Sequence, residues 1–135
     1  MRIKAGALEM MVRLQDRAGR SAGGTAGPID LAHLDRVTFG NAELRREVLA
    51  MFDRQAVKLA AEIAAAPDTH SRREAAHTLR GAALGIGANA VAGACTEIEE
   101  FAGDADELKA ALARLAIRVA EARLAIGGLL AKDGS

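Results

Sequence analysis

Apolar residues recur every three or four positions from about residue 30 to the C-terminus, which is the spacing of one face of an α-helix. The longest run starts at Asp104, and its apolar positions form a seam of alternating steps: Leu108, Leu112, Leu115, Val119, Ala122, Ile126 and Leu129. Such a seam is typical of helices that pack in a bundle. No segment alternates between apolar and polar residues with a period of two, so no sheet is expected.

Start and stop signals divide the rest of the pattern into further helices. Pro28 and Asp30 open a short helix that should end near Thr38, before Gly40. Asn41 is the expected N-cap of a long second helix, and the Pro67-Asp68 pair ends it.

Three further helices are expected in the second half of the chain. The segment Ser71-Arg72-Arg73-Glu74 has the form of a capping box and should start a helix that runs to about Ala88. Asn89 is the expected cap of a helix closed by Gly103, and Asp104 begins the last one.

The expected fold is all-α: an antiparallel four-helix bundle over residues 28–132, preceded by a short additional helix. Residues 1–27 are interpreted as an N-terminal extension, with a loosely periodic helix over the first twenty residues and a flexible Gly- and Ser-rich linker over residues 19–28. The short connections between the four main helices favour antiparallel neighbours.

Composition excludes several classes of function. The 18 basic and 18 acidic residues balance, and the chain has three Phe but no Trp or Tyr, so nucleic acid is not an expected partner.

The single cysteine, Cys95, excludes an internal disulfide and fits a reducing compartment. There is no apolar run long enough to cross a membrane and no secretory signal, so the expected location is the cytoplasm.

The helix expected over residues 71–88 carries an outward-facing histidine. At about 100° per residue, one arc gathers the apolar positions that should face the core: Ala75, Leu79, Ala82, Ala83 and Ile86. His77 points away from this arc, so its imidazole should face solvent.

The neighbours of His77 on the same helix suggest a docking surface. Arg73 and Arg80 lie about one turn before and after it, while Gly81 and Gly85 follow one and two turns later. A glycine inside a helix costs about 1 kcal/mol relative to alanine, so we expect both glycines to lie outward and give another protein clearance to approach. We expect Leu84 to add an exposed apolar contact.

Residues 76–88, with the sequence AHTLRGAALGIGA, resemble the signature of the histidine-phosphotransfer (HPt) domains. In that family the active histidine is followed by Leu, a basic residue, Gly, two small residues and a later Gly-Ala. The residues Val91, Cys95, Ile98 and Glu99 also resemble the helix that follows in the family. One departure is Arg80, where the family often has lysine; arginine keeps the charge and offers a planar fork to phosphate oxygens.

The resemblance implies a relay in which His77 is phosphorylated and passes the group between aspartates of receiver domains. The implied partners are the receiver domain of a hybrid histidine kinase and that of a response regulator. Arg80, and less directly Arg73, would stabilise the phosphoryl group, and Gly81, Leu84 and Gly85 would contact the partner. Magnesium would come with the receiver, so no metal site or cofactor is expected in this chain, which the resemblance implies to be a monomer.

Two other functions compete with this one. A helical adaptor could bind receiver or kinase domains without chemistry. An autonomous histidine kinase needs an ATP-binding domain with Asn- and Gly-rich boxes, for which 135 residues of helix leave no room. We therefore expect a phosphocarrier without kinase activity of its own.

Other chemistry-bearing residues have simpler interpretations. We interpret Cys95 as a buried small apolar residue and His33 and His70 as ordinary solvated or partly packed side chains. The acidic cluster of Glu97, Glu99 and Glu100 is interpreted as a solvated face. The glycines between residues 81 and 93 follow no strand, which argues against a phosphate-binding loop.

Overall fold

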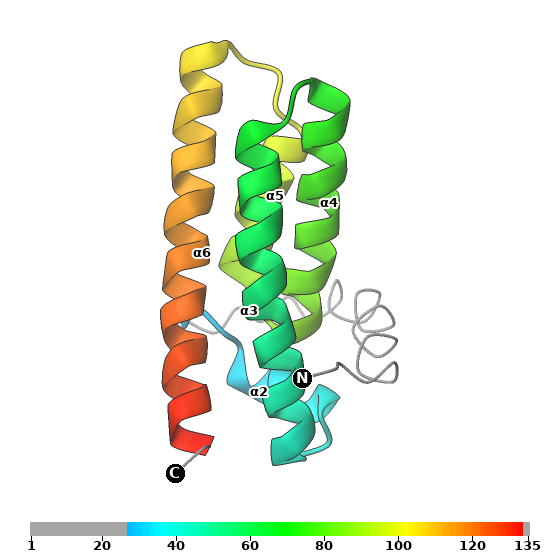
Figure 1. The fold of residues 1–135 in the computed structure, drawn as a ribbon, viewed down its shortest axis with the longest axis vertical. Helices are drawn as coiled ribbons and strands as arrows, with labels where there is room; N and C mark the ends of the chain where they lie inside the picture. Colours follow the sequence, from blue (N-terminus) through cyan, green and yellow to red (C-terminus); the bar gives the residue numbers. More distant parts are fainter. Residues whose placement is uncertain (1–26, 134–135) are drawn as a thin grey trace.

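The computed structural model describes residues 27–133 as a bundle of four long helices with a short fifth helix across one end (Figure 1). The short helix α2 spans Leu31–Val37, and the bundle consists of α3 (Ala42–Ala65), α4 (Thr69–Ile86), α5 (Asn89–Glu99) and α6 (Ala105–Asp133). This confirms the all-α bundle expected from the periodicity. The helix expected within the first twenty residues lies outside the described residues, and no helix of residues 27–133 is long and apolar enough to span a bilayer.

Each bundle helix packs against two neighbours. α4 contacts α3 and α5, and α6 also contacts α3 and α5, so α4 and α6 lie diagonally across the bundle. The core between the four helices is filled by large side chains that are almost completely buried: Leu49, Phe52, Ile63, Leu79, Ile86, Ile98 and Ile126. Because all four helices contribute, the core fixes the direction in which each helix presents its outer face.

The caps explain where the helices begin. Asp30 and Asn41 accept hydrogen bonds from the backbone N–H groups of His33 and Leu44, as expected for N-caps. The expected capping box at Ser71 is wrong: Asp68 is the cap of α4, its carboxylate accepts the Ser71 N–H at 2.7 Å, and the helix begins at Thr69. An aspartate side chain accepts the same hydrogen bond as a serine, so Asp68, which we had assigned to the end of the preceding helix, caps α4 three residues before Ser71.

The start of α5 also differs from the expectation. Asn89 is the first residue of the helix, and the cap position is Ala88, which forms no side-chain cap. Ala88 is fully buried, so packing fixes this helix start where no side chain caps it.

The short helix α2 closes the C-terminal end of α4. The N–H of Asp30 donates to the carbonyl of Gly87 at 2.8 Å, and the His33 ring nitrogen Nε2 lies 3.2 Å from the carbonyl of Gly85. The last carbonyls of a helix lack partners inside it, so α2 satisfies groups that would otherwise be unpaired. Gly87 has a φ of 81° and a Cβ there would lie 3.0 Å from Asp30, so only glycine fits at this junction.

Candidate functional site

His77 stands on the outer face of α4, in the middle of the helix. Its side chain is 66% exposed, whereas Ala75, Ala76 and Leu79 on the opposite side belong to the buried core. The outward direction predicted from the helix periodicity is therefore observed. The imidazole is accessible to a second molecule.

A carboxylate from the neighbouring helix holds one nitrogen of this ring. Oε1 of Glu99, on α5, lies 3.0 Å from Nδ1 of His77. A carboxylate has no hydrogen to donate at neutral pH, so this contact is a hydrogen bond only when Nδ1 carries the proton. In a neutral ring with its proton on Nδ1, the free lone pair is on Nε2, the nitrogen on the far side of the ring from Glu99.

Arg80 completes a three-residue cluster with His77 and Glu99. Its Nε lies 2.9 Å from Glu99 Oε2 and its Nη2 lies 3.0 Å from His77 Nδ1. The Nε–Oε2 contact is an ion pair but not a hydrogen bond. Oε2 of Glu99 is buried and has no hydrogen-bond partner. With Nδ1 protonated, the Arg80–imidazole contact joins two donors, so it is Glu99 that holds the guanidinium in place.

The sequence interpretation missed the role of Glu99. Glu99 was assigned to a solvated acidic face, but its side chain is only 18% exposed and contacts both His77 and Arg80. Glu97 fits the solvated interpretation better, because it pairs with Arg114 at 2.9 Å on a half-exposed surface. The available signal was the resemblance of Glu99 to the family's following helix, since spacing along one helix does not reveal a contact between two helices.

Beside the cluster lies an open depression of about 430 Å³. It is lined by residues of α4 and α5: His70, Arg73, Glu74, His77, Thr78 and Glu99. His70, 85% exposed, forms an ion pair with Glu74 at 3.2 Å when its ring is protonated. The depression therefore offers an accessible, mixed-charge surface directly next to the imidazole.

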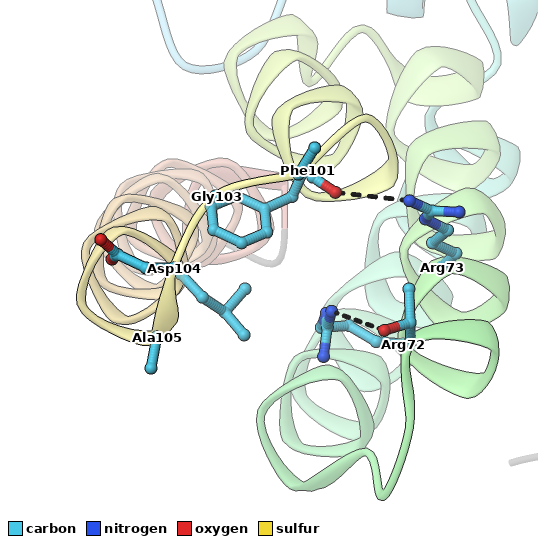
Figure 2. A pocket seen from close by; sticks show the side chains of 9 residues that line it. Arg72, Arg73, Phe101, Gly103, Asp104 and Ala105 are labelled. Carbon is cyan, nitrogen blue, oxygen red and sulfur yellow. Dashed lines mark hydrogen bonds between the residues drawn. The ribbon is translucent and has the colours of Figure 1, made fainter.

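Arg73 is turned away from the imidazole. Its Nη2 donates to the carbonyl of Phe101 at 3.3 Å, across to the connection between α5 and α6 (Figure 2). There it lines a second pocket of about 340 Å³ together with Arg72, whose Nε is buried and has no hydrogen-bond partner. The structure thus brings Arg80, and not Arg73, into contact with His77.

The expected clearance at the glycines is wrong. Gly81 and Gly85 are buried, and Leu84 is half-buried against the core cluster. At Gly85 the reason is visible, because His33 of α2 contacts its carbonyl. The periodicity of α4 alone could not reveal that a separate short helix packs over its C-terminal turns.

His33 and Cys95 are both structural. His33 is 5% exposed and ties α2 to α4, so it is more than the partly packed residue expected. Cys95 is fully buried, as expected, and burial followed by the nearby Glu99 charge raises the pKa of its thiol to about 12. The thiol therefore stays protonated and unreactive in the folded chain. Within residues 27–133 no three His, Cys, Asp or Glu side chains gather as a metal site.

Comparison with known proteins agrees with the geometry. The family model of the Hpt domain matches residues 43–127, which include α4, α5 and most of α3 and α6. No curated protein and no solved structure gives a significant match. The matched segment is well over half of the chain and contains His77, Arg80 and Glu99. The chain therefore belongs to the Hpt domain family, the histidine phosphocarriers of two-component signalling.

Proposed function

We propose that this chain relays a phosphoryl group between aspartates of receiver domains through phosphorylation of His77 at Nε2. The observation that carries the proposal is the state of the ring: it is 66% exposed, and Glu99 engages Nδ1 at 3.0 Å. Nε2 is then both accessible and unprotonated, which a nucleophile requires. The donor is the receiver of a hybrid histidine kinase, and the acceptor is that of a response regulator.

The transfer step balances without a further reactant. The Nε2 lone pair attacks the phosphorus of the aspartyl phosphate, an N–P bond forms, and the P–O bond breaks as the aspartate carboxylate leaves with the electron pair. The imidazole keeps its Nδ1 proton and becomes cationic. The Glu99 carboxylate, already 3.0 Å from Nδ1, stabilises that charge. The return of the group to a second aspartate reverses the same step.

Arg80 is proposed to offset the charge of the phosphoryl group. Its guanidinium is one-third exposed and held beside the imidazole by Glu99, so the donors not used by Glu99 can meet phosphate oxygens. Arg73 takes a lesser part, because it donates to the Phe101 carbonyl. Magnesium is expected to come with the receiver domain.

The partner is proposed to dock on the outer surface of α4 and α5 around His77. The exposed side chains there are those of Arg73, Glu74 and Thr78 on α4, with His70 one further turn away. We therefore expect the docking surface toward the N-terminal half of α4, without a direct part for Gly81 and Gly85, which are buried. We propose that the exchange occurs in the cytoplasm, where a free thiol such as Cys95 persists.

The test is transfer of radiolabelled phosphate from phosphorylated receiver domains of the source organism. The wild type is expected to take up label on His77, His77→Ala to take up none, and His70→Ala still to take up label on His77. His70 is a suitable control because it is an exposed histidine on the same helix. Label that persists on His77→Ala, or that never reaches the wild type, would contradict the proposal. Receiver binding without label would instead support the adaptor function.

A further inference from the structure

The outer face of α6 carries a second apolar seam that the fold does not use. The core seam of α6 is buried through Leu115, Val119, Ala122 and Ile126. Opposite to it, a row with alternating steps of three and four residues is exposed throughout: Ala110, Ala113, Ile117, Ala120, Leu124 and Gly127. We call this row the outer seam.

The outer seam exposes two large apolar side chains and a glycine for which packing within one chain gives no reason. Ile117 is 54% and Leu124 is 79% exposed. A Cβ added at Gly127 would meet no atom within 4 Å, so the monomer gives no packing reason for a glycine there. Glycine inside a helix costs about 1 kcal/mol relative to alanine, but it lets a second helix approach closely. The row has the spacing of the contact positions of a coiled coil.

We propose that the outer seam binds a second copy of this chain, so that two α6 helices pack antiparallel and the phosphocarrier is a homodimer. A two-fold axis between Arg118 and Val119 makes three kinds of layer. Ile117 faces Ala120 of the second copy, Ala113 faces Leu124, and Ala110 faces Gly127. Each layer joins a larger side chain to a smaller one, which is how closely packed helices fill the space between them.

The flanking charges select this register. In it, Arg114 of each copy, which pairs with Glu97 of its own chain, lies beside Glu121 of the other copy, which pairs with Arg118 of its own chain. Each of the two contacts therefore adds an opposite charge to an existing ion pair. A shift by one heptad in one direction brings the two Glu121 side chains together, and a shift in the other direction brings the two Arg114 side chains together. A parallel pair would place Lys109 beside Arg114 of the other chain. Of these four arrangements, the antiparallel register centred near residue 118 is the one that brings no like charges together among these flanking residues.

The dimer leaves the phosphotransfer site free. α6 lies diagonally across the bundle from α4 (Figure 1), so an interface on the outer face of α6 points away from the helix that carries His77. Both imidazoles of the dimer remain accessible. The inference does not depend on the proposed function, and it departs from the monomer that the family resemblance implied.

The first test is the mass of the full chain in solution, measured by light scattering at a concentration on the order of 100 µM. The wild type is expected at twice the chain mass of 14.0 kDa, and Leu124→Glu at the chain mass itself. The matched control is Val57→Glu, because Val57 is 46% exposed but lies on α3, outside the outer seam. A monomeric wild type, or a Leu124→Glu variant that dimerises as well as the wild type, would overturn the proposal.

The second test fixes the orientation by cysteine cross-linking. A mixture of Ala113→Cys and Leu124→Cys is expected to form a mixed disulfide, whereas each variant alone stays monomeric on a denaturing gel. Cross-linking of Leu124→Cys with itself would indicate a parallel pair and overturn the antiparallel register. The native Cys95 does not interfere, because it is buried inside the bundle. Phosphotransfer by Leu124→Glu at the wild-type rate would confirm that the interface and the His77 site are separate.

Discussion

At the scale of single residues, the chemistry depends on which nitrogen of His77 carries a proton. In the proposed mechanism Glu99 decides this through its 3.0 Å contact with Nδ1, and its other oxygen lies 2.9 Å from Arg80. One carboxylate would then orient both the proposed nucleophile and the cation beside it. A carboxylate that orients a metal-bound imidazole in the same way changes activity about ten- to a hundredfold when it is removed, and we take this as the scale for Glu99.

Replacement of Glu99 by alanine is expected to slow phosphotransfer about ten- to a hundredfold, because Nδ1 loses its hydrogen-bond acceptor. The ¹⁵N chemical shifts of the His77 ring should show a larger population of the tautomer protonated at Nε2. Glu97→Ala is the control, since Glu97 lies on the same helix but pairs with Arg114. An unchanged rate and an unchanged tautomer in Glu99→Ala would exclude this role.

Arg80→Ala is expected to lower the transfer rate about tenfold, with little change in the denaturant midpoint. A partly exposed side chain contributes little to folding, whereas a charged hydrogen bond to the phosphoryl group is lost. Arg73→Ala should lower the rate less, because its guanidinium is bound to the Phe101 carbonyl. Comparable loss of rate and stability in Arg80→Ala would argue against a role at the phosphoryl group.

At the scale of elements, α4 is defined by Asp68 at one end and by α2 at the other. Asp68 caps the first turn, while His33 and Asp30 bind carbonyls of the last turn. The helix that carries His77 is thus fixed at both termini. This makes the two ends suitable places to test stability without touching the candidate site.

His33→Ala is expected to destabilise the fold by about 1–3 kcal/mol, because the buried Gly85 carbonyl loses its partner. Denaturant unfolding measures this change, and hydrogen exchange should locate increased opening in α2. Arg36→Ala, on the exposed side of the same helix, is the control. The interpretation fails if the two variants are equally stable.

Asp68→Asn is expected to weaken the dependence of stability on pH in the acidic range. The hydrogen bonds that Asp68 accepts from Ser71 lower the pKa of its carboxyl below 3.8. The ionised form is therefore favoured by folding: its contribution is complete above that pH and is lost as the pH falls through the lowered value. Denaturant midpoints at neutral and acidic pH should differ less in Asp68→Asn than in Asp106→Asn. Equal differences would show that Asp68 contributes nothing to the acid sensitivity.

At the scale of the whole molecule, the bundle and the outward direction of His77 followed from the spacing of apolar residues along single helices. The start of α3 followed from its expected cap, Asn41, and the start of α2 followed from the Pro28-Ile29-Asp30 signal. Contacts between helices did not follow in this way: neither the pairing of Glu99 with His77 nor the cover of α2 over Gly85 has a signature along one helix. The first depends on how α5 is rotated against α4, and the second on where a short preceding helix packs.

The most direct test of the central claim is to identify the phosphorylated atom. The purified chain is treated with phosphoramidate, a small phosphoryl donor, and the product is examined by ³¹P and long-range ¹H–¹⁵N NMR. The account predicts one phosphohistidine, at Nε2 of His77, that is absent from His77→Ala. A phosphoryl group on Nδ1 of His77, or on another residue, would contradict it.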